Sequence, residues 1–359
     1  MHRALLAFGI VAFVAGCGDS SKQDTSQTAA GATAARSATT SGADLTGAGA
    51  TFPYPLYSKW FDAYATKTGV KINYQSIGSG GGIRQLSEQT VDFGASDAPM
   101  SDAELAKAKG GPVLHIPTAL GAVVVIYNVP QLTAPLKLNG DVLAAIYQGQ
   151  ITRWNDARIA ALNVGVTLPA TDILVVHRSD GSGTSYVFTD YLASVSAAWA
   201  TKPGKGKEVQ WPVGLGAKGN EGVAGQVKQT PGAIGYAELA YATQNKLATA
   251  TLANASGEYV APSIASVTAA AAGAAGALPA NTDYRVSIVN AKGAGAYPIS
   301  SFTWILVYAR QADPAKGKKL TDFLRWALSE GQEMEAALDY APLPESMRAA
   351  LVTRLDSIK

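Results

Sequence analysis

The segment RSDGSGTSYVF, which begins at Arg178, gathers an arginine, an aspartate, glycines and several hydroxyl side chains at the start of a helical pattern. Two other segments have the same design, GAGATFPYPLYSKW at 47–60 and IGSGGGIRQL at 77–86. A helix N-terminus carries free N–H groups and a partial positive charge, and glycine lets the backbone approach a ligand closely. The three segments together predict a site for an anion such as phosphate, with serine and threonine as uncharged donors.

The common enzyme patterns that handle phosphate or ester groups are missing from these segments. The chain has no G-x-x-x-x-G-K-[ST], and neither DGSGT nor IGSGG fits G-x-S-x-G. His115 lies in an apolar pattern typical of a packed core. Arg178 is expected to disfavour the protonated form of His177 and to point it to the opposite face of the strand. The spacings of common zinc and calcium sites are absent. The pattern favours a protein that holds an anion, but a phosphatase or esterase with Ser79 or Ser182 as nucleophile stays open.

Asp97 follows a strand pattern in VDFGASDAPMS, among small residues. It can be a simple turn or N-cap aspartate. A carboxylate beside an anion site, however, repels the ligand unless the ligand brings a proton. Asp97 is therefore a candidate for discrimination between protonated and unprotonated anions.

The elements that must position these residues alternate between short apolar strands and amphipathic helices, and Ser101 and Glu104 form a predicted capping box. Such alternation predicts α/β architecture with largely parallel sheets, and the last third of the chain is expected to be helical. The Ala/Gly-rich segment 268–282 is expected to form a surface helix with a loop. The expected strands are 71–77, 91–96, 117–130, 172–178 and 301–309, and the expected helices are 81–90, 101–108, 182–194 and 315–330.

The composition and the N-terminus indicate an exported globular protein. The chain has 359 residues, 47% hydrophobic and 16% charged, with a net charge of +2, which is too mild to suggest nucleic-acid binding by bulk charge. Residues 1–16 resemble an export signal that ends in a lipobox before Cys17, the single cysteine, which is the expected lipidation site. Residues 17–43 carry almost no large apolar side chains and are expected to form a flexible tether. This combination predicts an extracytoplasmic, lipid-anchored protein of the bacterial cell envelope.

From Leu45 to Ile358 the sequence resembles the periplasmic phosphate-binding proteins of bacterial phosphate-specific ABC transporters. The resemblance implies a type II periplasmic-binding-protein fold, in which two α/β lobes joined by crossover strands surround a ligand cleft. The crossovers are placed near 118–122 and 298–303, so that lobe one is 44–119 plus 299–359 and lobe two is 120–298. Ala217 stands where the family commonly has glycine, away from the ligand loops. Beyond the anion-site segments, the resemblance is carried by VDFGASDAPMS, WPVGLGAKGNEGVA at 211–224, PGAIGYAELAYA at 231–242 and LDYAPLP at 338–344.

The family's ligand positions carry over residue by residue onto this sequence. Phe52 and Gly183 are implied to contribute their backbone N–H groups, and Asp180 is implied to orient the arginine. The implied phosphate ligands are Thr51, Phe52, Ser79, Asp97, Arg178, Ser182, Gly183 and Thr184.

The resemblance further implies a monomeric, non-enzymatic protein without a cofactor or metal. Such a protein binds inorganic phosphate outside the cytoplasm and delivers it to the membrane permease of an ABC importer. A receptor for another tetrahedral oxyanion such as sulfate, or a phosphate sensor that signals without transport, remains an alternative.

Overall fold

The computed structural model describes residues 44–132, 134–274 and 283–359. The expected signal segment 1–16, the lipidation site Cys17 and the tether 17–43 lie outside the described residues, as does the end of the Ala-rich segment from residue 275. In the described part, no helix is both long enough and apolar enough to cross a membrane.

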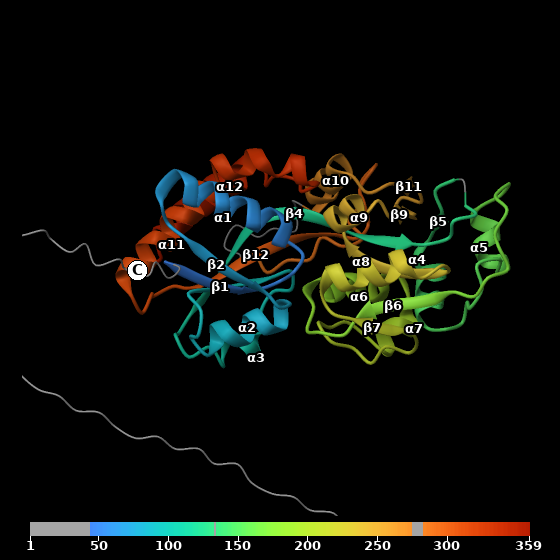
Figure 1. Cartoon of the computed structure of the whole chain (residues 1–359), viewed down its shortest axis with the longest axis horizontal. Helices are drawn as coiled ribbons and strands as arrows, with labels where there is room; N and C mark the ends of the chain where they lie inside the picture. Colours follow the sequence, from blue (N-terminus) through green and yellow to red (C-terminus); the bar gives the residue numbers. More distant parts are fainter. Residues whose placement is uncertain (1–43, 133, 275–282) are drawn as a thin grey trace, which may run out of the picture. The chain divides into compact units, whose positions relative to one another are not determined.

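The first lobe is a parallel sheet of three strands, β1 (Leu45–Gly49), β2 (Ile72–Ser76) and β3 (Phe93–Ser96), with β1 in the middle. Helices α1 (Tyr54–Thr68) and α11 (Pro314–Ala327) cover one face, and α2 (Ser79–Ser87) covers the other (Figure 1). Each connection from β1 and β2 runs directly from the end of a strand into a helix. The carboxyl ends of these parallel strands therefore bring the helix N-termini to one edge of the sheet.

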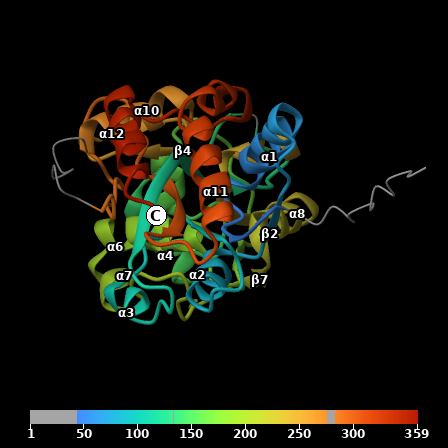
Figure 2. The ribbon, with the colours of Figure 1, turned by 90° about the vertical axis from the view of Figure 1, so that its left-hand side faces the viewer.

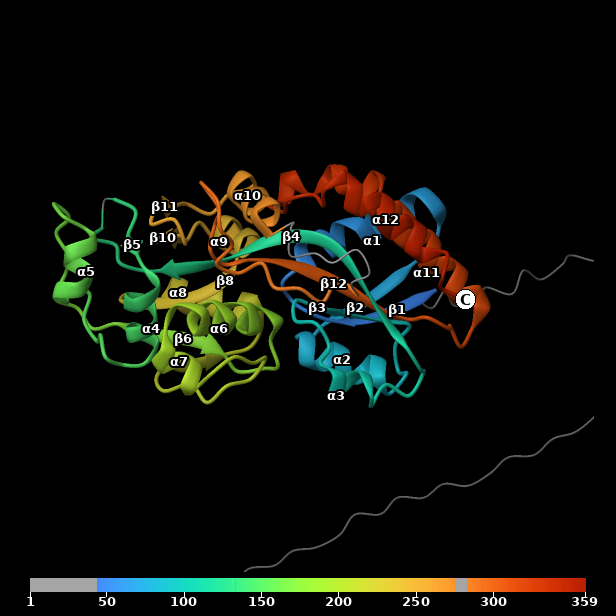
Figure 3. The ribbon, with the colours of Figure 1, turned by 180° about the vertical axis from the view of Figure 1, so that it is seen from behind.

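Two antiparallel strands join the lobes. The strand β4 (Val113–Tyr127) is almost entirely buried and pairs along its first part with β12 (Ser300–Tyr308). Its last residues, from Val123, pair instead with β8 (Ala233–Glu238) of the second lobe. The register of β4 and β12 shifts between Thr303 and Trp304. Figure 3 shows β4 and β12 passing side by side from one lobe toward the other.

The second lobe repeats the design of the first. The strands β8, β6 (Leu174–Arg178) and β7 (Leu215–Ala217) are parallel to one another, with β6 between the other two. The helices α4 (Gly140–Tyr147), α6 (Gly183–Val195) and α8 (Gly219–Gln229) pack around them. The helices α6 and α8 begin just after β6 and β7 end, so their N-termini also gather at the carboxyl edge of the sheet.

The remaining elements complete the two lobes, and Figure 2 shows α11 beside the C-terminal helix α12. A small second sheet has the order β11-β10-β5, and β9 pairs with β4. These elements are α3 (Asp102–Leu105), β5 (Lys137–Leu138), α5 (Ala157–Leu162), α7 (Ala197–Thr201), α9 (Leu239–Asn245), β9 (Ala248–Thr249), β10 (Thr251–Ala253), β11 (Tyr259–Val260), α10 (Ile264–Ala274), the 3₁₀ segments η2 (Glu330–Met334) and η3 (Ala336–Leu338), and α12 (Glu345–Leu355).

The predicted α/β architecture of two lobes joined by crossover strands is confirmed. Each expected strand and helix is present near its expected bounds, and Ser101 forms the capping box with Glu104. Two expectations are wrong. The sheet is parallel only within each lobe, because the crossover strands pair antiparallel with β3 and β8 and with each other. The last third is not wholly helical, since it contains β9 to β12.

Candidate functional site

The glycine-rich segments of the two lobes lie against each other. The N–H of Gly80, in the first turn of α2, donates to the carbonyl of Gly181 at 2.8 Å. A Cβ atom added to Gly183 would lie 2.5 Å from Asp97 Oδ2 and still closer to Ser79 Oγ. Only glycine fits at position 183, so its backbone can approach these two side chains. The structure thus brings Ser79 and Asp97 of one lobe together with Gly183 of the other.

Arg178 is the last residue of β6 and is held by Asp180. Its Nε donates to Asp180 Oδ1 at 2.7 Å and its Nη2 donates to Oδ2 at 2.5 Å, a bidentate pair. The N–H of Gly219 donates to the same Oδ1 at 3.1 Å. Burial alone would raise the pKa of Asp180, but the hydrogen bonds and charge of Arg178 outweigh it and hold that pKa below its usual value. Asp180 therefore stays ionised and fixes the plane of the guanidinium.

Asp97 follows β3 and is 1% exposed. Thr303, on the crossover strand β12, donates its hydroxyl to Asp97 Oδ1 at 2.8 Å, and the Asp97 N–H donates to Ser79 Oγ at 3.3 Å. Burial raises the pKa of Asp97 from 3.8 to about 7, although Thr303, Arg178 and Ser79 each oppose the rise. Near neutral pH this carboxyl can therefore accept or give up a proton, a property that a simple turn aspartate lacks.

Thr51 and Phe52 precede α1, and both are buried. Tyr241 donates its hydroxyl to the Thr51 carbonyl, and Tyr340 donates to the Phe52 carbonyl, both at 2.6 Å. These two hydrogen bonds fix the peptide planes on either side of the Phe52 Cα atom. Thr51 Oγ1 faces the second lobe and joins a hydrogen-bond network there.

Asn220, in the first turn of α8, links Thr51 of the first lobe to Thr184 of the second. Its Nδ2 donates to Thr51 Oγ1 at 2.7 Å and to Thr184 Oγ1 at 3.0 Å. Arg178 Nη1 lies 3.4 Å from Thr184 Oγ1. Sequence reasoning did not select Asn220 as a site residue, although it lies within the string GLGAKGN. A buried asparagine in that string looks like any polar residue at a helix start, and nothing local shows that its partners lie in distant segments.

Ser182 caps α6, where its Oγ accepts from the Ser185 N–H at 2.9 Å. This serine is buried at the edge of the site beside Gly183. The eight predicted ligand residues and Asp180 thus gather at one place. They come from the carboxyl edges of both sheets.

The two histidines of the described chain are engaged elsewhere. His115 Nε2 accepts from the Met100 N–H at 3.0 Å, so Nδ1 carries the proton toward Asp283 Oδ2 at 2.9 Å. His177 stacks on Trp211 with ring centroids 4.9 Å apart. Burial lowers the pKa of His177, and a charge effect of Arg178 is not the cause, contrary to the sequence-based argument. Neither histidine is placed as a base for Ser79 or Ser182.

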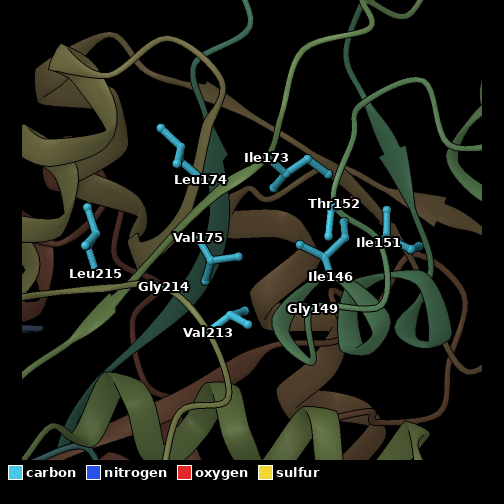
Figure 4. A pocket seen from close by; sticks show the side chains of 10 residues that line it. All are labelled: Ile146, Gly149, Ile151, Thr152, Ile173, Leu174, Val175, Val213, Gly214 and Leu215. Carbon is cyan, nitrogen blue, oxygen red and sulfur yellow. The ribbon is translucent and has the colours of Figure 1, made fainter.

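A separate apolar pocket of about 370 Å³ lies in the second lobe (Figure 4). Its lining comes from α4, the start of β6 and the segment before β7, and Thr152 supplies its one side-chain hydroxyl. It has no charged side chain to attract an anion, and it shares no residue with the site between the lobes. The lining residues are Ile146, Gly149, Ile151, Thr152, Ile173, Leu174, Val175, Val213, Gly214 and Leu215.

Known proteins resemble this chain over most of its length. The family model described as the PBP superfamily domain matches residues 27–331. The chain is 45% identical over 347 residues to the phosphate-binding protein PstS of Xylella fastidiosa, covering 96% of this chain and 94% of that protein. It is 47% identical over 316 residues to PstS of Pasteurella multocida, covering 86% and 89%.

Solved structures share the fold. A high-affinity periplasmic phosphate-binding protein, PfluDING bound with phosphate, aligns with a TM-score of 0.69 at 21% identity, covering 86% of this chain and 93% of that one. The phosphate-binding protein of Stenotrophomonas maltophilia aligns with a TM-score of 0.67 at 21% identity, covering 88% and 94%. The prediction of a type II periplasmic-binding-protein fold is confirmed.

Proposed function

Because the chain belongs to the PstS phosphate-binding proteins of the PBP superfamily, we propose that it binds inorganic phosphate outside the cytoplasm and delivers it to the membrane permease of a phosphate ABC importer. The observation that carries this proposal is the convergence of donors from both lobes around Arg178 and Asp97. The role is that of a monomeric binding protein without a cofactor, a metal or nucleic acid.

The proposed ligands are the eight residues of the sequence prediction. Arg178 supplies one full positive charge, which Asp180 partly offsets, so the hydroxyls of Thr51, Ser79, Ser182 and Thr184 and the N–H groups of Phe52 and Gly183 must supply much of the attraction. A hydrogen bond to a charged group contributes about 1.5–3 kcal/mol. Several such bonds, less the costs of desolvation and association, leave roughly 8 kcal/mol, which corresponds to a micromolar site.

Asp97 is proposed to select phosphate over sulfate. Phosphate retains a proton near neutral pH and can donate it to the carboxylate, whereas sulfate would place an oxygen against Asp97 acceptor to acceptor. An unpaired buried acceptor costs about 1–3 kcal/mol, and more if it is charged. Discrimination therefore works by repelling the wrong ligand, which disfavours the alternative of a sulfate receptor.

The lobes are proposed to close on the anion. The proposed boundaries are 44–119 plus 299–359 for lobe one and 120–298 for lobe two. The place where β4 changes partner, from β12 to β8 near Ala122 and Val123, supports the proposed crossover. An anion that contacts both lobes binds the closed state better and shifts the population toward it. The permease would recognise that state.

The proposed location is the bacterial cell envelope, with the protein held by a lipid on Cys17 after removal of residues 1–16. The chain would then face the periplasm or the cell surface on the tether 17–43. Treatment of cells with globomycin, which inhibits the lipoprotein signal peptidase, should leave an unprocessed precursor. A mature form of normal size under that treatment would contradict lipidation at Cys17.

Calorimetric titration of the purified protein with phosphate, sulfate and arsenate tests the proposed function. We expect stoichiometric binding of phosphate, weak or no binding of sulfate, and no turnover of a chromogenic phosphate ester. Steady hydrolysis of the ester that is lost in Ser79→Ala or Ser182→Ala would establish the hydrolase alternative instead. The engaged histidines and the capping role of Ser182 argue against that outcome.

A further inference from the structure

Asn220 is fully buried, and each of its side-chain groups has a partner. Its Oδ1 accepts from the Glu238 N–H at 2.9 Å, and its Nδ2 donates to Thr51 Oγ1 and Thr184 Oγ1. Its backbone N–H also donates to Thr51 Oγ1, at 3.1 Å. Asn220 therefore contacts one predicted ligand residue in each lobe, but is not itself a predicted ligand.

The orientation of this amide is determined by chemistry. A backbone N–H can only donate, so the side-chain atom that faces Glu238 must be the amide oxygen. The amide NH₂ group consequently faces the two threonine hydroxyls, and both hydroxyl oxygens act as acceptors toward Asn220.

A hydroxyl group has two acceptor lone pairs and one proton. Asn220 occupies both lone pairs of Thr51 Oγ1, through its Nδ2 and its backbone N–H. Thr184 Oγ1 accepts from Asn220 Nδ2 and faces Arg178 Nη1. Each hydroxyl can therefore make a further hydrogen bond only as a donor.

We infer that Asn220 is a positioning residue that makes the hydroxyls of Thr51 and Thr184 obligatory donors toward the bound anion. This inference rests on the proposed function, which places both threonines on phosphate. A freely rotating hydroxyl could accept a hydrogen bond from a protonated ligand oxygen, but these two cannot. A protonated ligand oxygen is therefore excluded from Thr51 and Thr184 and is directed to Asp97, so Asn220 contributes to specificity without contacting the ligand.

A double-mutant cycle measured by phosphate calorimetry tests this role. Asn220→Ala is combined with Thr51→Val and, separately, with Thr184→Val, each in the full chain. We expect Asn220→Ala alone to weaken phosphate binding by about 10- to 100-fold. In either valine background the same substitution should cost at least fivefold less, because its effect acts through the hydroxyl that is no longer there.

The matched control is Asn163→Ala. Asn163 is a buried asparagine at the end of α5, and its amide holds the backbone N–H and carbonyl of Lys137 in β5, at the end of the second lobe away from the first (Figure 1). Its replacement should lower the unfolding temperature and leave phosphate affinity unchanged. If Asn220→Ala does not unfold cooperatively, the cycle is measured with Asn220→Ser, which retains a small polar group.

The outcomes separate this inference from the proposed function. In one outcome, the wild-type protein binds phosphate while the fold-losses in affinity of the single variants simply multiply in both double variants. That result would overturn the role of Asn220 and leave the proposed function intact. No phosphate binding by the wild-type protein would overturn the proposed function and this inference with it. Coupling in both valine backgrounds, absent for Asn163→Ala, is the expected result.

Discussion

Replacement of Asp97 by asparagine keeps the shape of the side chain and removes its titration. The carbonyl oxygen of asparagine can still accept from Thr303, so the hydrogen bond to the crossover strand is retained. The change therefore isolates the charge of Asp97. Two consequences follow, one for stability in the absence of ligand and one for anion selectivity.

The expected effect on stability is large and depends on pH. The pKa of Asp97 rises on folding from 3.8 to about 7, which corresponds to about 4 kcal/mol disfavouring the carboxylate in the folded protein. A raised acidic pKa means that the folded state binds the proton more tightly than the unfolded state. Wild-type stability is consequently lost as pH increases from about 4 to about 7, and the loss levels off above that range. Asp97→Asn lacks this loss.

The assay is urea unfolding of both proteins at pH 5, 6, 7 and 8, in buffers free of phosphate and sulfate, because a ligand that binds the folded state would add its own stabilisation. We expect the free energy of unfolding of Asp97→Asn, relative to wild type, to increase by about 3 kcal/mol from pH 5 to pH 8, because most of the change falls between pH 5 and about 7. A difference that stays constant with pH would show that Asp97 does not titrate in this window and would refute the desolvation argument.

The same variant tests selectivity. Wild-type protein should bind sulfate more tightly as pH falls below about 7, where a protonated Asp97 can donate to an oxyanion. Asp97→Asn should bind sulfate without that pH dependence and more tightly than wild type at pH 8, by about 5- to 150-fold if it relieves 1–3 kcal/mol of repulsion. Unchanged rejection of sulfate by the variant would mean that another group discriminates between the anions.

Three further substitutions test other parts of the site. Arg178→Ala should weaken phosphate binding by at least 100-fold and abolish the phosphate-induced rise in Tm. The substitution removes the positive charge of the guanidinium and leaves Asp180 without its charged partner. Near-wild-type affinity would place the site elsewhere. Gly183→Ala should fold, since alanine suits the first turn of α6. Calorimetry should show a loss of at least 100-fold in phosphate affinity, because the added Cβ collides with Ser79 and Asp97. Tight binding would mean that the lobes do not approach this closely. Burial raises the pKa of Glu238 well above its usual value, so the stability of Glu238→Gln relative to wild type should increase with pH. The expected increase is about 1.4 kcal/mol per pH unit above the carboxyl's usual pKa. Urea unfolding that gives a pH-independent difference would contradict this.

The parts of the site that sequence could predict are those with a local signature. Ser79, Arg178 and Gly183 lie where a strand ends, small residues follow and a helix begins, and that order is visible within a few residues. Asp97 was identifiable as a candidate for the same reason, since it follows a strand. Its raised pKa was not, because that results from burial in the folded protein, which outweighs the opposing hydrogen bond from Thr303, 206 residues away in sequence.

The parts that sequence could not predict depend on long-range pairing. The antiparallel direction of β4 and β12 is decided by which strands lie next to each other, and periodicity of apolar residues does not encode it. Asn220 is separated from Thr51 by 169 positions, so its role appears only once the two lobes are assembled. The expected charge effect of Arg178 on His177 was wrong because adjacency in sequence said nothing of burial or of Trp211.

In the proposed site, residues that are not proposed ligands fix the orientation of those that are. The positive charge of Arg178 is largely committed to Asp180, so the remaining attraction must come from neutral dipoles, and a neutral dipole helps an anion only if it points the right way. Asp180 fixes the guanidinium, Thr303 occupies one oxygen of Asp97, and Asn220 sets the hydroxyl protons of Thr51 and Thr184. In the proposed site, with the donors of Arg178, Thr51 and Thr184 oriented and Asp97 as an acceptor, anions of similar charge and size would be distinguished by the number of protons they carry.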